Sequence, residues 1–318
     1  MEELIIPEEE KHAILSYLCS RGQILNQIEV FDHMWSELLL QPTQRGWLRL
    51  LRINLRRLRS AVVLLGPILP PSGAHWLEFL KKTAEQLGNV REYDVAVRGC
   101  EKYAAAMAND ENARAAVKVA CGEDAPLELE NMQMLLQQKR DVQTQLWLEN
   151  AREGCIAEAL KDLMQLLENE EEVARAEKNL AKEFFRVRLA DWSVKLSKKL
   201  NEVDASTSYT ELHKVRIKVK RFRYAYDVYM RNHVDVELLE ALKDMQDILG
   251  SIHDGERNIE IMTALAVPKY SEALGKELAC YKAWREQKIK QRLAEFPEAR
   301  TCLLECLKHS LSGNKLNY

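Results

Sequence analysis

The most constraining feature of this sequence is a run of arginines that recur at helical spacing between residues 45 and 59. Residues three and four positions apart lie on one face of an α-helix, so these side chains form a stripe about 21 Å long. Apolar residues form a parallel stripe, and no acidic residue occurs between Pro42 and Leu77. Like charges at this spacing repel by roughly a few tenths of a kcal/mol per pair, so the pattern indicates a helix that holds an anion. The segment carries Arg45, Arg49, Arg52, Arg56, Arg57 and Arg59.

The same pattern occurs again between residues 212 and 223. A shift of 164 positions superimposes the two segments, with cations on cations and apolar residues on apolar residues. A second matched pair, Leu87 to Asp94 and Leu249 to Glu256, follows at a shift of 162. Two matched blocks in the same order indicate an internal duplication. The matched cations of the second segment are His213, Arg216, Lys220, Arg221 and Arg223, and we include Lys214 and Lys218 as secondary contacts.

The composition favours an all-α protein. Gly and Pro are few, strand-like alternation is rare, and Leu, Ala, Glu, Lys and Arg are abundant. The best internal break is Gly122 to Pro126, so we predict one helical repeat over residues 1–125 and a second over 126–318.

The charge is concentrated on the two basic segments. The formal net charge of the chain is −3, although each segment carries six positive charges and no negative one. Arginine forks bind phosphate oxygens in a bidentate manner, and lysines add point charges. If the repeats pack about a pseudo-twofold axis, the stripes face each other across a groove or tunnel and favour a linear polyanion. The alternative is that each stripe is a solvated helix face.

Helical periodicity and breaker residues define the expected elements. We expect Gly88 and Gly250 to end helices as C-terminal caps, and Pro297 to begin the last one. We also expect a short helix between Pro7 and Leu18. The remaining helices are expected at 24–40, 43–65, 74–87, 92–107, 110–121, 127–152, 154–168, 170–201, 208–231, 236–250, 255–265, 268–293 and 297–311.

Several residues near the stripes have two alternative roles. Arg91 and His253, at equivalent positions after the two Leu-Gly pairs, add a second ring of positive charge as secondary contacts. Asp94 and Glu256 either cap a helix start or pair with a stripe arginine. His213 either binds phosphate as imidazolium or bonds to a neighbour in its helix. The aromatic residues are stacking platforms or core residues: Trp47, Trp76, Phe222 and Tyr224.

The remaining motifs argue against catalysis, metals and membranes. The seven cysteines form no CxxC pair, and Cys302 and Cys306 share a helix face as packing residues, which fits a reducing cytosol. We find no phosphate-binding loop, no HExxH and no GxSxG, and no apolar run of membrane-spanning length. The acidic N-terminus resembles neither a signal peptide nor an anchor. We therefore expect a cytoplasmic, non-enzymatic protein with no cofactor and no metal.

Four blocks resemble the CHAD domain, the conserved histidine α-helical domain: residues 52–59, 87–94, 212–224 and 249–254. The resemblance extends from about residue 10 to 311. It implies two pseudo-symmetric four-helix bundles around a central basic channel, and binding of inorganic polyphosphate with association to polyphosphate granules in some members. CHAD domains are often joined to a triphosphate tunnel (CYTH) domain, for which we see no motif here. The resemblance implies a polyphosphate site in two halves. The first half consists of Arg49, Arg52, Arg56, Arg57 and Arg59, and the second of His213, Arg216, Lys220, Arg221 and Arg223.

Two positions depart from the family pattern. Arg49 replaces the histidine of the first repeat, so that only His213 remains of the symmetric pair and a pH response shared by both halves is not expected. Glu92 replaces the usual aspartate. Three other functions compete with polyphosphate binding: binding to an RNA or DNA backbone, phosphoryl chemistry on polyphosphate, and binding to an acidic partner protein.

Overall fold

The computed structural model describes residues 7, 9–11, 14, 23–151, 155–167, 175–229, 235–266 and 271–312 of the chain. Within these ranges every regular element is helical, so the all-α prediction is confirmed. None of the described helices is long and apolar enough to cross a membrane. Of the expected helix between Pro7 and Leu18, residues 9–11 and 14 are described and are helical, and its other residues after Pro7 lie outside the described ranges. The first residues of the helix expected at 170–201 and the tail after Ser312 also lie outside them.

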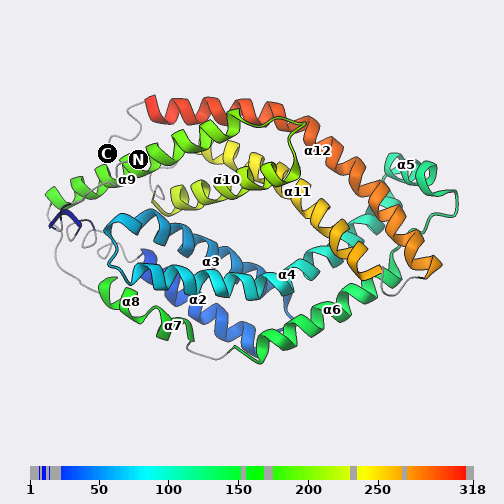
Figure 1. Cartoon of the computed structure of the whole chain (residues 1–318), viewed down its shortest axis with the longest axis horizontal. Coiled ribbons are helices and arrows are strands. Elements are labelled where there is room, and N and C mark those ends of the chain that lie inside the picture. Colours follow the sequence, from blue (N-terminus) through cyan, green and yellow to red (C-terminus); the bar gives the residue numbers. More distant parts are fainter. Residues whose placement is uncertain are drawn as a thin grey trace.

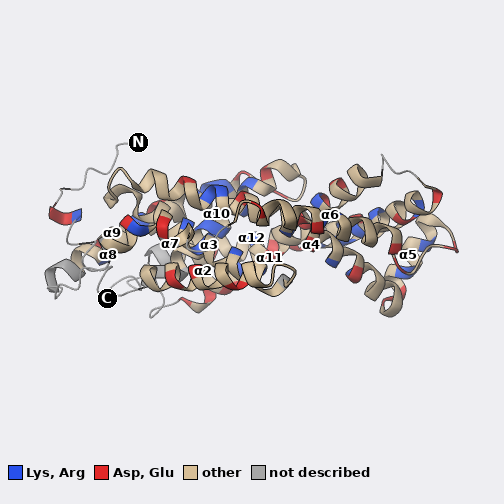
Figure 2. Cartoon of the chain, turned by 90° about the horizontal axis from the view of Figure 1, so that it is seen from below, with Lys and Arg blue, Asp and Glu red and all other residues tan. Residues whose placement is uncertain are grey.

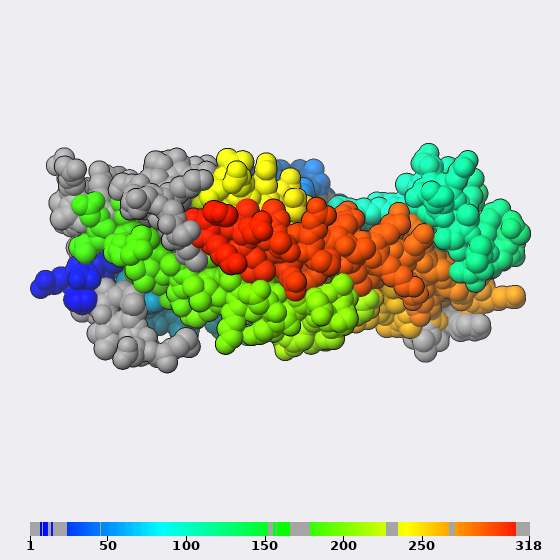
Figure 3. Space-filling view, turned by 90° about the horizontal axis from the view of Figure 1, so that it is seen from above, coloured from blue at the N-terminus to red at the C-terminus, as the bar shows by residue number. Residues whose placement is uncertain are grey.

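The helices form an elongated body (Figure 1). Helices α9 and α12 follow one long edge, α2, α7, α8 and α6 follow the other, and α3, α4, α10 and α11 lie between them. In the view from above, α12 runs along the middle of the long face (Figure 3). The elements are α2 (Gln23–Leu40), α3 (Arg45–Leu65), the 3-10 turn η1 (Gly66–Ile68), α4 (Gly73–Asn109), α5 (Glu111–Cys121), α6 (Glu130–Leu148), α7 (Cys155–Ala159), α8 (Lys161–Leu167), α9 (Arg175–Asn201), α10 (Tyr209–Tyr229), α11 (Val236–Ala266) and α12 (Glu272–Ser312).

The apolar stripes of the two basic helices are buried as predicted. In α3 they contact α2 and α4, and in α10 they contact α9 and α11. Each fully buried Leu, Val or Phe side chain contributes roughly 1.5–3 kcal/mol relative to exposure. This burial fixes the rotation of both helices about their axes, and with it the direction of the cations. The buried members are Leu48, Leu51, Leu55, Leu58, Val62 and Leu65 in α3 and Leu212, Val215, Val219, Phe222 and Tyr226 in α10.

The hydrophobic core consists of two clusters. The larger joins α2, α3, α9 and α10 to parts of α4, α11 and α12. The smaller lies where the second half of α4 meets α5, α6, the end of α11 and the start of α12. Each cluster combines residues from before and after position 125. The division into repeats 1–125 and 126–318 stays a prediction.

Three expected helix boundaries are wrong. Helices α4, α11 and α12 run without interruption through Gly88, Gly250 and Pro297. A glycine inside a helix costs only about 1 kcal/mol, which the buried residues on both sides offset. The interior proline removes one backbone hydrogen bond, and Figure 1 shows α12 bent rather than broken. The expected helix at 154–168 is two short helices, α7 and α8.

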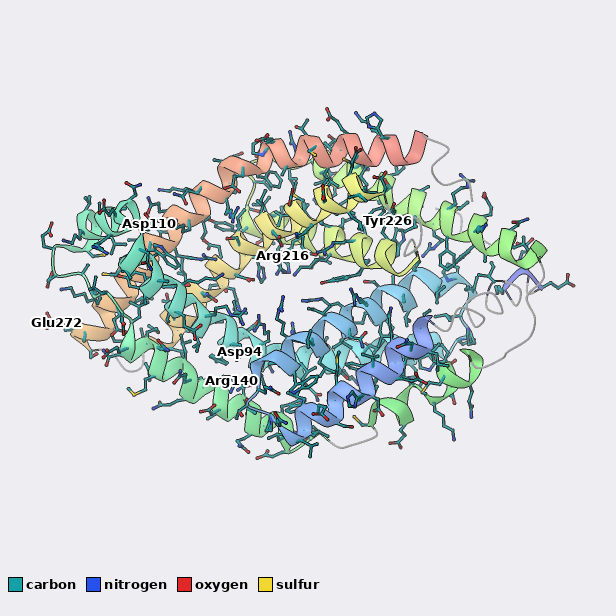
Figure 4. The ribbon with its side chains drawn as sticks, turned by 180° about the vertical axis from the view of Figure 1, so that it is seen from behind. Asp94, Asp110, Arg140, Arg216, Tyr226 and Glu272 are labelled. Atoms are coloured by element: carbon teal, nitrogen blue, oxygen red, sulfur yellow. The ribbon has the colours of Figure 1, made fainter. Side chains whose placement is uncertain are left out.

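A buried ion pair connects the lower edge of the molecule to the first basic helix. Asp94 of α4 is fully buried and accepts a hydrogen bond of 2.6 Å from Nε of Arg140 in α6. Arg140 also donates to the carbonyl of Thr43, just before α3, at 3.0 Å. The two side chains lie together in Figure 4. The expected role of Asp94 as a helix cap is wrong, because Asp94 lies inside α4. Its partner Arg140 is a cation outside the two stripes.

Glu256 likewise lies inside a helix, α11, close to Tyr209, where burial and the charge of Glu256 raise the pKa of Tyr209 to about 12. Glu256 therefore does not cap a helix, and no ion pair between it and a stripe arginine occurs among the described residues. Gly250, six residues earlier, lies within the same continuous helix and does not end it.

We predict that Arg140→Met lowers the free energy of unfolding by roughly 3 kcal/mol, because it leaves the buried Asp94 carboxylate without its closest cation. Chemical denaturation followed by circular dichroism measures this. The matched control is Lys139→Met on the exposed neighbour, which we expect to change stability by about 0.5 kcal/mol or less. Equal stability of the two variants would contradict a structural role for the pair.

Candidate anion-binding site

A pocket of about 660 Å³ lies between the two basic helices, with α4 and α11 completing its walls. Ten of its lining residues are arginine or lysine and three are carboxylates. Lys and Arg also gather on α3 and α10 in Figure 2. The pocket is therefore strongly cationic in a chain of nearly balanced charge. The ten cations are Arg49, Arg52, Arg56 and Arg57 of α3, Arg91 of α4, Arg216, Lys220 and Arg223 of α10, and Lys243 and Arg257 of α11.

The structure brings together most of the residues predicted for the site. Seven of the eleven predicted primary residues line the pocket, and so do two of the four secondary contacts, Arg91 and His253. The side chain of Arg45 lies outside the described residues. The predicted residues that are described but do not line this pocket are Arg59, His213, Lys214, Lys218 and Arg221.

These other residues have different surroundings. Arg59 and Arg221 approach each other between α3 and α10, where burial and the Arg221 charge lower the pKa of Arg59. Lys214 forms an ion pair of 2.5 Å with Glu211, and Lys218 is exposed. The expected second half of the site is therefore smaller than predicted, since only three of its five primary residues enter the pocket.

Two arginines occupy the same setting in the two halves of the pocket. Arg52 of α3 lies against Gly88 of α4, and Arg216 of α10 lies against Gly250 of α11. A Cβ atom at Gly88 would lie 3.5 Å from the Arg52 guanidinium, and one at Gly250 would lie 4.0 Å from Nε of Arg216. Arg52 also donates to the carbonyl of Ala84 at 2.9 Å. The repeated Leu-Gly pairs thus provide room for an arginine rather than a helix end.

The cations of the pocket perturb one another. Lys220 is partly buried, and this burial together with the charges of Arg216 and Arg56 lowers its pKa to about 6. Burial and the neighbours Arg56 and Arg91 lower the pKa of Arg52 to about 10. Both shifts follow from positive charge that is packed closely and partly withdrawn from water. The site therefore has an excess of positive potential that nearby carboxylates do not cancel.

Two of the three carboxylates hold cations in place. Glu92 of α4 accepts a hydrogen bond of 2.8 Å from Arg257 of α11, and so joins the two walls. Asp254 lies 3.6 Å from Arg216 and 3.2 Å from Nδ1 of His253. Burial opposes the ionisation of Asp254, but the hydrogen bond from His253 and the charge of Arg216 outweigh it and lower its pKa.

Aromatic residues have different roles. Trp76 and Phe222 are core residues, and Trp47 packs against the core. Tyr224 is buried but borders the pocket, where the guanidinium of Arg56 lies 5.6 Å from the centre of its ring. A cation over an aromatic face is stabilised by roughly 0.5–2 kcal/mol. Tyr224 therefore positions a stripe arginine.

Sequence reasoning missed Lys243 and Arg257, which line the pocket from α11. Both lie outside the duplicated blocks. The signal was nonetheless present, because positions 243, 246, 250, 253 and 257 recur at steps of three and four and share one helix face. The expected helix end at Gly250 concealed this pattern.

With the fold and the pocket known, comparisons with known proteins identify the family. The family model described as CHAD domain matches residues 31–263. The chain belongs to the CHAD domain family. The crystal structure of the CHAD domain from the plant Ricinus communis has a similar fold, with a TM-score of 0.60 and 18% sequence identity over 95% of this chain and 93% of that chain. A comparison with curated proteins gave no match.

Two histidines of this CHAD domain, His213 and His253, lie at the edge of the pocket. His213 and His253 stack with ring centres 4.6 Å apart, and only His253 lines the cationic pocket. Burial and the neighbouring His253 and Arg216 lower the pKa of His213. Arg49 lines the pocket. It stands at the position where the family pattern has the histidine of the first repeat. No group of three or more His, Cys, Asp or Glu side chains within the described ranges is arranged to hold a metal ion.

We predict that Lys220→Met stabilises the ligand-free CHAD domain by roughly 1–3 kcal/mol at pH 7, because it removes an amine from a crowded, partly buried site. The pKa of Lys220 is about 6 in the folded protein, against 10.5 for an ordinary lysine. At pH values between these two, the unfolded state therefore binds more protons than the folded state. The wild-type protein should therefore lose stability as the pH falls from about 10 to about 6, relative to the variant. Urea denaturation at several pH values measures the difference, and parallel curves would contradict it.

Proposed function

We propose that this CHAD domain binds inorganic polyphosphate, without catalysing a reaction on it, in the pocket between α3 and α10. One observation carries the proposal: ten arginine and lysine side chains from four helices line a single pocket of about 660 Å³. Guanidinium groups bind phosphate oxygens in a bidentate manner, and a chain of linked phosphates presents such oxygens at every unit.

The uncompensated charge supports a ligand with many negative charges. Crowded cations raise the free energy of the ligand-free protein, as the lowered pKa values of Lys220 and Arg52 indicate. A polyanion relieves this repulsion, and each added phosphate finds a further cation along the stripes. Perturbed ionisable groups of this kind are typical of functional sites.

We further propose that the matched halves are pseudo-symmetric four-helix-bundle repeats and that the pocket is part of a central channel. The repeated setting of Arg52 against Gly88 and Arg216 against Gly250 supports this symmetry. Arg59 and Arg221, which approach each other beyond the pocket, extend the positive path between α3 and α10.

Binding without catalysis is supported by the engagement of two of the three carboxylates that line the pocket. Metal-assisted phosphoryl transfer uses carboxylates that are free to hold Mg²⁺. Glu92 is bonded to Arg257, and Asp254 is engaged with His253 and Arg216. We expect no phosphate release from polyphosphate when the protein is incubated with Mg²⁺ or Mn²⁺. The cellular role that fits such binding is placement on polyphosphate granules in the cytoplasm.

The alternative function is binding to a nucleic-acid backbone, since cationic helices attract any phosphate chain. The enclosed position of the cations favours a thin flexible chain over a double helix, whose major groove alone is about 12 Å wide. Competition separates the two functions. Long-chain polyphosphate should displace labelled RNA at a much lower phosphate concentration than RNA requires to displace polyphosphate.

We predict that the double variant Arg56→Glu with Lys220→Glu abolishes polyphosphate binding at moderate salt while helicity is retained. The change places two carboxylates among the residues that line the pocket, and polyanion affinity depends steeply on the number of cations. Titration with labelled long-chain polyphosphate, together with circular dichroism, measures both properties.

The matched control for the double variant is Lys82→Glu with Lys218→Glu, which makes the same change of charge at exposed residues outside the pocket. We expect it to weaken binding by less than about five-fold through the general field alone. Equal losses in the two double variants would show that net charge, and not this pocket, controls binding.

We predict that polyphosphate binds more tightly as the pH falls from about 8 to about 6. The pKa of Lys220 is about 6 in the ligand-free protein, and a bound anion raises it, so that binding takes up a proton over this range. Terminal phosphates titrate nearby, so the comparison is made with Lys220→Arg, whose charge is constant. A wild-type profile as flat as that of Lys220→Arg would contradict proton uptake by Lys220.

A further inference from the structure

A second, smaller pocket of about 370 Å³ adjoins the cationic pocket. His253 and Arg257 line both pockets and therefore form the wall between them. The smaller pocket extends to the N-terminal turns of α10, where Tyr209, Thr210 and His213 line it. The two pockets are therefore neighbours that share two lining residues.

The chemistry of the smaller pocket differs from that of its neighbour. Its walls contain the apolar side chains of Leu212, Leu249 and Ile252. Three flat rings also line this pocket: the imidazoles of His213 and His253, which stack on each other, and the phenol of Tyr209. Flat rings and apolar side chains are the surfaces on which a heterocyclic base packs.

The charge of the smaller pocket disfavours further phosphates. Its cations already have acidic partners: Lys214 is paired with Glu211, and Arg257 lies between Glu92 and Glu260. Glu256 adds a further negative charge to its walls. Because Lys214 and Arg257 are already paired with carboxylates, this pocket favours a neutral group with hydrogen-bond donors over a further phosphate.

We propose that this protein also binds nucleoside polyphosphates, with the phosphates in the cationic pocket and the nucleoside in the adjoining pocket lined by His213, His253 and Tyr209. This inference rests on the proposed function, because the same cations hold the phosphates. The carboxylates of Glu256 and Glu260 accept hydrogen bonds from ribose hydroxyls or from the amino group of a base. The two ends of a nucleoside polyphosphate match the two pockets. Its flat, uncharged base suits the smaller pocket, and its anionic phosphate chain suits the cationic pocket.

The test compares ATP with inorganic tripolyphosphate, which has the same number of phosphates but no nucleoside. Isothermal titration at one ionic strength, without divalent ions, measures both affinities for the full chain. We expect ATP to bind at least about five-fold more tightly than tripolyphosphate, which is the low end of what stacking one base contributes.

Two tryptophan variants separate the pockets. Thr210→Trp places a large ring at the exposed rim of the smaller pocket, so the preference for ATP should disappear while tripolyphosphate affinity stays within about two-fold. The matched control is Ile217→Trp, also at an exposed position of α10 but outside both pockets, and it should keep the preference. Arg56→Gln, in the cationic pocket alone, should weaken both ligands.

The outcomes distinguish this inference from the proposed function. If tripolyphosphate and long-chain polyphosphate bind but ATP has no advantage, the nucleoside pocket is refuted and polyphosphate binding stands. If Thr210→Trp weakens both ligands equally, the nucleoside pocket is also refuted. If no polyphosphate binds to the wild-type protein, both proposals fail.

Discussion

The structure depends on a conflict between apolar burial and electrostatic repulsion along α3 and α10. One face of each helix is buried in the core, which fixes the opposite cations towards a shared pocket. Repulsion among these cations opposes that arrangement, and the pKa of Lys220, lowered to about 6, reflects its strength. Each cation pair costs a fraction of a kcal/mol near the surface, whereas each buried side chain stabilises by roughly 1.5–3 kcal/mol. Burial therefore prevails, and the protein retains a positively charged pocket.

Ion pairs between neighbouring helices connect the walls of the pocket to one another and to the rest of the fold. Glu92 and Arg257 join α4 to α11, and the Asp94–Arg140 pair joins α4 to α6 and, through a backbone carbonyl, to the start of α3. Glu92 and Asp94 each neutralise one cation, and ten arginines and lysines still line the pocket against three carboxylates. The helices that carry these cations are joined before a ligand arrives, and a site organised in advance loses less entropy on binding.

In the binding that we propose, the neighbouring pockets divide recognition between charge and shape. The larger would attract phosphates at long range through its excess of positive charge. In the smaller pocket Lys214 and Arg257 are paired with carboxylates, so that flat rings and apolar side chains determine what fits. His253 belongs to both, and it connects the two kinds of recognition through its stacking on His213 and its hydrogen bond to Asp254.

The sequence by itself determined the helical fold, the two stripes on α3 and α10, and the types of residue that meet in the pocket, because these depend on local periodicity and on unbalanced charge. Only the tertiary structure decided which cations converge. Lys243 and Arg257 enter from α11, while Lys214 and Lys218 of a basic helix point elsewhere. The sequence pattern predicts a helix end at Gly88, whereas in the structure Gly88 lies inside α4 and provides space for Arg52 of α3. A sequence pattern gives the face of a helix on which a residue lies, whereas the packing of distant helices decides what that face contacts.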